Sequence, residues 1–144
     1  MPDDKDFLLE NIEKLVYKIT DIGHILHSHG HIEHIGATKD FVDMSGAKTY
    51  IGKGDEDTVA GRNGLQWTNE FKMEYTGAFE ADVIISDGDR ITIANRELYF
   101  ISTLGHTAGT LSIQPLGYRK IWRKMCFCIR WRQRFQSPRR SASA

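Results

Sequence analysis

The spacing of hydrophobic positions predicts both helices and strands in the first 116 residues. Near the N-terminus, apolar side chains recur at the three- and four-residue spacing of an amphipathic helix over residues 7–17. They are Leu8, Ile12, Leu15 and Val16. Two more helices are predicted at residues 36–44 and 55–60. Short apolar or alternating runs predict strands at residues 25–27, 49–52, 83–85, 90–94, 98–103 and 110–113. The expected fold class is α+β.

Histidines gather directly after the first predicted strand. Five of the six lie between positions 24 and 34, and the sixth, His106, stands in the segment Gly-His-Thr-Ala-Gly. Alternate side chains of an extended segment point the same way, so His29 and His31 can approach one ion. A catalytic zinc usually has three protein ligands and one water, and neutral imidazole suits it. We therefore predict a zinc site made by His29, His31 and His106.

A second metal ion is the next hypothesis. Glu33 falls on the same alternation as His29 and His31, whereas His34 is displaced from it. His34 could reach a neighbouring ion and share it with the Glu33 carboxylate. The sequence thus predicts a site for one or two ions.

These motifs resemble those of the metallo-β-lactamase superfamily. The superfamily motif HxHxDH corresponds to His29, His31, Glu33 and His34, with Glu in place of Asp, and the later Gly-His-Thr-x-Gly contains His106. The resemblance covers about residues 8–114. It is nearest to the β-lactamase subclass that has histidine rather than cysteine in the second site. The fold that it implies is the N-terminal half of an αββα sandwich, hence a truncated domain.

The resemblance also implies a mechanism and a ligand set. Metal-bound hydroxide would attack a carbonyl carbon of a β-lactam or of a related cyclic amide or ester. Glu33 would orient the nucleophile and accept its proton, which makes it the expected catalytic residue. His29, His31 and His106 would bind the first zinc, and Glu33 and His34 the second. A third ligand to the second ion is not found after His106, so we expect the second site to be weaker.

Alternative readings remain for the other histidines and the aromatic residues. A histidine-rich tract can bind metal adventitiously on a surface. His24 and His27 lie outside the motif and are expected to be structural or solvated. Aromatic residues recur every four positions, which predicts one stripe along a helix; they are Trp67, Phe71, Tyr75 and Phe79. Such a stripe would either pack in the core or form a wall over the substrate. No function is assigned to the pair Cys126 and Cys128.

Size and hydropathy indicate one domain, and the resemblance implies a small-molecule substrate. The chain has 144 residues, of which 40% are hydrophobic. No apolar run approaches the roughly 20 residues that a membrane-spanning helix needs. The start lacks the pattern of a signal peptide, in which charged residues precede an apolar run. We therefore expect the chain as given to be cytoplasmic. A full-length relative could be secreted or periplasmic. Neither a nucleic-acid nor a membrane partner is expected.

Charge divides the chain sharply near residue 116. Residues 1–116 contain 10 Lys and Arg against 19 Asp and Glu, whereas residues 117–144 contain 9 basic and no acidic side chains. We predict a partial metallo-β-lactamase-like domain over 1–116 and a poorly ordered basic tail over 117–144. One reading of this tail is an arm that binds nucleic acid or an anionic surface, since basic groups neutralise phosphates and indoles stack on bases.

Translation out of frame is the interpretation of the tail that we favour. With permitted codons, a one-base shift over residues 117–135 yields a polar turn, an apolar strand and a glycine-rich loop. We expect the gene sequence around residues 115–117 to contain such a frame. DNA sequencing tests this, and a gene without that frame would leave the basic arm as the remaining interpretation.

Overall fold

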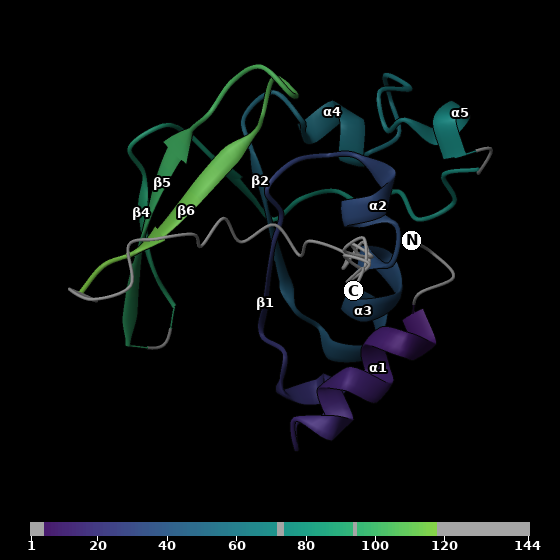
Figure 1. Cartoon of the computed structure of the whole chain (residues 1–144), viewed down its shortest axis with the longest axis vertical. Helices are drawn as coiled ribbons and strands as arrows, with labels where there is room; N and C mark the ends of the chain where they lie inside the picture. Colours follow the sequence, from purple (N-terminus) through teal and green to yellow (C-terminus); the bar gives the residue numbers. More distant parts are fainter. Residues whose placement is uncertain (1–4, 72–73, 94, 118–144) are drawn as a thin grey trace, which may run out of the picture.

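A computed structural model describes residues 5–71, 74–93 and 95–117 (Figure 1). Its helices are α1 (Lys5–Lys14), α2 (Ile32–Ile35), α3 (Thr38–Ser45), α4 (Glu56–Val59) and α5 (Thr68–Phe71), with a 3₁₀ turn at Ile19–Asp21. Its strands are β1 (His24–Leu26), β2 (Lys48–Gly52), β3 (Val83–Ile85), β4 (Arg90–Ile93), β5 (Arg96–Ser102) and β6 (Leu111–Pro115). No helix among these residues is long and apolar enough to cross a membrane. Residues 118–144 of the predicted basic tail lie outside the described residues.

The strands form two three-stranded sheets of different kinds. In the first sheet, β2 lies between β1 and β3 and pairs in parallel with both, with Leu26 opposite Tyr50 and Tyr50 opposite Val83. In the second sheet, β5 lies between β4 and β6 and pairs antiparallel with both. Parallel strands need long connections, and the helices α2 to α5 lie in those connections.

The parallel sheet is the middle of three layers. Between the two sheets lies one core cluster, which consists of Tyr50, Ile85, Phe100 and Leu111. On the other face of the parallel sheet lies a second cluster that includes Ile51 of β2 and residues of α2 and α4. Neighbouring side chains of a strand point to opposite faces, so Tyr50 and Ile51 serve different clusters. The described residues thus form helix, sheet and sheet layers, which is the predicted partial αββα sandwich (Figure 1).

The predicted N-terminal helix ends three residues too late. Helix α1 ends at Lys14, and Val16 has a φ angle of +66°, which lies in the left-handed region and ends a right-handed helix. The side chains of Leu15 and Val16 are 69% and 92% exposed. Leu8 and Ile12 are half-buried, so only the first part of the predicted apolar stripe packs against the domain.

The predicted helix of aromatic residues is wrong. Helix α5 ends at Phe71, and the segment that contains Tyr75 and Phe79 has no regular structure. Both of these rings pack against the cluster around Ile51, so core packing is the correct reading for them. Trp67 precedes α5 and has a φ angle of +61°, so the four residues do not share one helical face.

One carboxylate links strand β2 to the segment that precedes β3. Asp82, next to β3, accepts hydrogen bonds through Oδ2 from the backbone N–H of Thr49 (2.8 Å) and from its hydroxyl (2.9 Å). These two hydrogen bonds lower the pKa of Asp82 below its usual value. The ionised carboxylate therefore stabilises the folded state.

Replacing Asp82 with Asn should lower the free energy of unfolding by about 1 kcal/mol at pH 7, the net value of a typical hydrogen bond. Because the folded-state pKa is depressed, this stabilisation is present above the unfolded-state pKa of about 3.9 and is lost as the pH falls below it. Urea unfolding of both proteins at pH 7 and near pH 3 measures this. An equal difference at the two pH values would contradict the assignment.

Candidate metal centre

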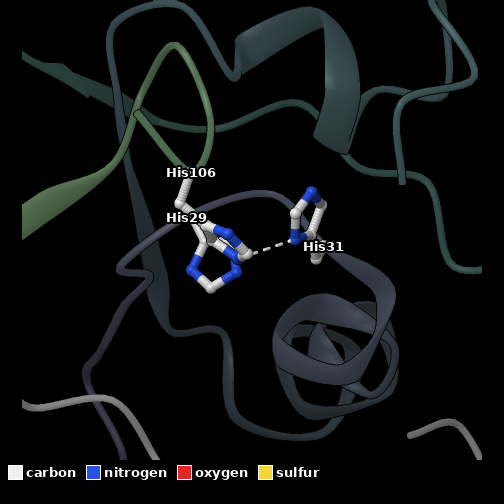
Figure 2. A group of neighbouring side chains, drawn as sticks. All are labelled: His29, His31 and His106. Atoms are coloured by element: carbon white, nitrogen blue, oxygen red, sulfur yellow. Dashed lines mark hydrogen bonds between the residues drawn. The ribbon is translucent and has the colours of Figure 1, made fainter. Parts of the chain in front are cut away.

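The histidine motif lies where the parallel strands end. Residues 28–31 follow β1, and residue 55 follows β2, so both segments meet at the carboxyl edge of the same sheet. Ligand sites of parallel sheets usually lie at this edge. The loop between β5 and β6 brings His106 to the same place from the antiparallel sheet (Figure 2). Two segments far apart in sequence therefore share one site.

The three histidines predicted to bind the first zinc converge. One ligand atom from each of His29, His31 and His106 lies within 4.8 Å of the others. The His31 and His106 rings contact each other through Nδ1 and Nε2 at 3.1 Å, and the centroids of the His29 and His106 rings are 4.6 Å apart (Figure 2). His29 and His31 are 3% exposed, whereas His106 is exposed. The group is thus buried at His29 and His31 and open to solvent at His106.

The predicted second group also forms, although by a different local structure. The backbone turns helical at Ile32, with His31 as the N-cap of α2, so the extended alternation ends before Glu33. Glu33 and His34 therefore project from the first turn of a helix. His29, Glu33 and His34 nevertheless place one ligand atom each within 4.8 Å of one another. His29 belongs to both groups, which the sequence did not predict.

Two orphaned polar atoms show that the site suits a cation. Among the described residues, the buried side-chain atoms without a hydrogen-bond partner are His29 Nε2 and Glu33 Oε2. Buried polar groups normally have partners, so such exceptions need a cause. A nitrogen lone pair and a carboxylate oxygen are donors that a divalent zinc ion accepts. The residues present therefore fit the metal that the motif implies.

The donor set is unequal between the two groups. His29 Nδ1 contacts the Ser28 hydroxyl at 3.0 Å, which leaves Nε2 as its free ring nitrogen. A nitrogen has one lone pair, so His29 can complete only one group at a time. If it joins His31 and His106, the second group retains Glu33 and His34 alone.

Burial favours the neutral form of three imidazoles of the site, those of His29, His31 and His34. Desolvation, followed by repulsion from His34 and the neighbouring rings, lowers the pKa of His29 to about 3. Desolvation also lowers the pKa of His31 and His34, although the Glu33 carboxylate opposes both shifts. Metal binding requires deprotonated imidazole, and burial favours that form at neutral pH.

The remaining two histidines have structural surroundings, as expected. His24 is exposed, and its Nδ1 contacts the Tyr50 hydroxyl at 2.8 Å. His27 is buried, and its Nε2 contacts the Thr38 hydroxyl at 3.2 Å. Burial lowers the pKa of His27 to about 4. Neither belongs to a group of potential ligands among the described residues.

An aromatic wall stands beside the histidines. The Trp67 ring stacks on His31 with centroids 4.4 Å apart and planes at 15°. Its side chain is 49% exposed, so part of the indole faces solvent. The residue before it is held in place, since the N–H of Ile32 donates to the carbonyl of Gln66 at 2.8 Å. Of the predicted aromatic stripe, Trp67 is the member that the structure shows beside His31 and His106.

Sequence reasoning missed Asp55, which lies next to the site. It was counted only as the start of a predicted helix. Asp55 is 2% exposed, and its carboxylate accepts hydrogen bonds from both loops that carry the candidate ligands. Nothing in the local pattern distinguishes it from an ordinary helix-capping Asp, so only the three-dimensional arrangement reveals it.

Comparison with known proteins agrees with this arrangement. The family model described as metallo-beta-lactamase superfamily matches residues 1–119. Similar solved structures include BJP-1, a subclass B3 metallo-beta-lactamase of Bradyrhizobium japonicum, with 28% identity over 80% of this chain and a TM-score of 0.72. The FEZ-1 metallo-beta-lactamase from Legionella gormanii has 23% identity over 78% of this chain and a TM-score of 0.70.

The match covers most of this chain but less than half of those enzymes. It spans 43% of the BJP-1 chain and 44% of the FEZ-1 chain. The family match extends over more than half of the 144 residues. The chain belongs to the metallo-beta-lactamase superfamily, whose fold and type of site make it a relative of metal-dependent hydrolases.

We expect the purified protein to bind about one zinc ion, because His29 can complete only one group. His29→Ala and His106→Ala should each lower zinc affinity by at least 10- to 100-fold, since losing even an outer partner of a ligand typically costs that much. Elemental analysis gives the stoichiometry, and competition with a chromophoric chelator gives the affinities.

His24→Ala is the matched control, because His24 belongs to the same histidine-rich stretch but to neither ligand group. It should bind zinc as tightly as the unchanged protein. Equal loss of affinity in all three variants would mean that the tract binds metal without a defined site.

Proposed function

We propose that this chain is the metal-binding half of a zinc-dependent hydrolase that opens a β-lactam or a related cyclic amide or ester. The observation that supports this most is the convergence of His29, His31 and His106 beside the half-buried Glu33 carboxylate, whose buried Oε2 has no hydrogen-bond partner. Three imidazoles and an open position are the ligand pattern of catalytic rather than structural zinc. Zinc held there would polarise a carbonyl and lower the pKa of bound water to about 7.

Glu33 is the residue that we assign to proton transfer. Its Oε2 is buried and has no hydrogen-bond partner, and its Oε1 lies 4.0 Å from His34 Nε2. A carboxylate in this position can orient an incoming water molecule and accept its proton.

The substrate is expected to be a small molecule with one apolar face. His106 is exposed, so the open side of the site is at its imidazole. The half-exposed Trp67 ring borders that side, with its centroid 5.7 Å from that of His106. An indole offers a large, rigid contact surface for a ring system such as a fused lactam. The metal chemistry alone does not distinguish lactams from lactones or thioesters.

We expect the zinc-loaded full chain to hydrolyse nitrocefin or a member of a lactone and thioester panel, and a chelator to abolish the turnover. Glu33→Gln should lower kcat by about 10²- to 10⁴-fold, the usual contribution of a general acid or base, while zinc stays bound. Absorbance assays with and without chelator measure the rates, and metal analysis of each variant reports the zinc content.

Zinc uptake without turnover of any substrate would contradict the proposed activity. That result would favour the alternative, a truncated and inactive metal-binding remnant. Turnover that persists with chelator, or that is equal in the Glu33→Gln variant, would contradict the assigned roles of metal and carboxylate. Different lactam and lactone rates would identify the substrate class.

A further inference from the structure

The Asp55 carboxylate contacts both loops that bear the metal ligands. Oδ2 accepts hydrogen bonds from the N–H of Gly30 (2.9 Å), between His29 and His31, and from the hydroxyl of Thr107 (2.6 Å), next to His106. Oδ1 accepts from the N–H of Gly109 at 3.0 Å. We propose that Asp55 is a positioning residue that sets the distance between the two ligand loops and so controls zinc affinity. This inference rests on the proposed zinc binding.

Close packing shows that the two loops are built around this carboxylate. A Cβ added at Gly109 would lie 2.8 Å from both Cβ and Cγ of Asp55. One added at Gly30 would lie 3.4 Å from Asp55 Cβ and 3.0 Å from Thr58 Cγ2. A side chain at Gly109 would therefore clash with Asp55 and with the Gly52 carbonyl, whereas one at Gly30 would press on Thr58 and only touch Asp55. Both glycines allow the backbone to approach the carboxylate closely.

The usual role of an Asp in this position does not account for Asp55. It occupies the N-cap position of α4, where an Asp side chain commonly accepts a hydrogen bond from its own helix. Here the side chain makes no such capping bond. All of its hydrogen bonds given above go to segments 25 to 54 residues away in sequence. The carboxylate thus joins two distant loops and does not stabilise its own helix.

Its position in the fold explains why these bonds matter for the metal. His29 and His31 follow the parallel sheet, whereas His106 belongs to a loop of the antiparallel sheet. Ligands in a zinc site must keep their distances within about 0.2 Å of ideal values. Hydrogen bonds to an ionised carboxylate are roughly twice as strong as neutral ones, which suits a group that must hold two layers in register.

Asp55→Asn tests the proposal, because an amide keeps the size of the side chain but replaces one acceptor oxygen with a donor. At least one of the three bonds is then lost. We expect zinc affinity to fall by about 10- to 100-fold, as for loss of other partners that orient metal ligands. The cobalt-substituted protein should show altered d–d bands, which report ligand geometry directly.

Asp82→Asn is the matched control. Asp82 also accepts from one backbone N–H and one threonine hydroxyl, but Thr49 lies in β2 and neither residue belongs to a ligand group. This variant should lose stability yet bind zinc within about twofold of the unchanged protein. Urea unfolding of the metal-free proteins separates stability from affinity. The proposal would be overturned if Asp55→Asn and Asp82→Asn both lost zinc affinity in proportion to the stability that each had lost.

A milder pair of variants covers the case in which Asp55→Asn does not fold. Thr107→Val removes one bond to the carboxylate, and Thr107→Ser keeps the hydroxyl. We expect weaker zinc binding in the first and unchanged binding in the second. If Thr107→Val, or a folded Asp55→Asn variant, binds zinc as tightly as the unchanged protein, the proposed role of Asp55 is overturned and the proposed zinc binding is not. Failure of the unchanged protein to bind zinc would overturn the proposed function as well.

Discussion

Parallel pairing of β2 with β1 and β3 is the constraint on which the rest of the structure depends. It aligns the ends of β1 and β2, so the segments that follow them emerge side by side at one edge. The two faces of β2 carry the two core clusters, with Tyr50 toward the second sheet and Ile51 toward the helices. Each fully buried apolar side chain stabilises the fold by about 1.5 to 3 kcal/mol relative to exposure. Burial of this one strand therefore fixes both the layers and the site.

The site combines that rigid frame with an energetically unfavourable group of side chains. Burial of His29 and His31, together with partial burial of Glu33 and His34, removes water from polar atoms, and two of those atoms have no hydrogen-bond partner. An unsatisfied buried group typically costs about 1 to 3 kcal/mol. The surrounding fold must offset this cost in the metal-free protein. Sites built for ligands often carry such a cost because the ligand later compensates it.

Local sequence patterns predicted the parts of the structure that depend on local physics. The strand at 83–85 followed from periodicity, and the choice of His29 and His106 as candidate ligands followed from motif resemblance. The structure contains that strand and brings the two side chains together. The end of α1 was missed because the apolar pattern continues through Val16 while the backbone does not. The bonds of Asp55 were missed because they link segments far apart in the chain. Patterns within a short window carry no information about such contacts.

The division of the ligands between two sheets has a consequence for how the protein responds to metal. Two imidazoles are anchored to the parallel sheet and one to the antiparallel sheet, so a bound ion would cross-link the layers at their edge. Binding to the folded state alone stabilises it by RT ln(1 + [L]/Kd), about 2.7 kcal/mol when zinc is present at 100 times its Kd. Loss of the ion would thus loosen the seam between the sheets. The zinc concentration would then set how stably the two sheets pack together, as well as whether the site can act chemically.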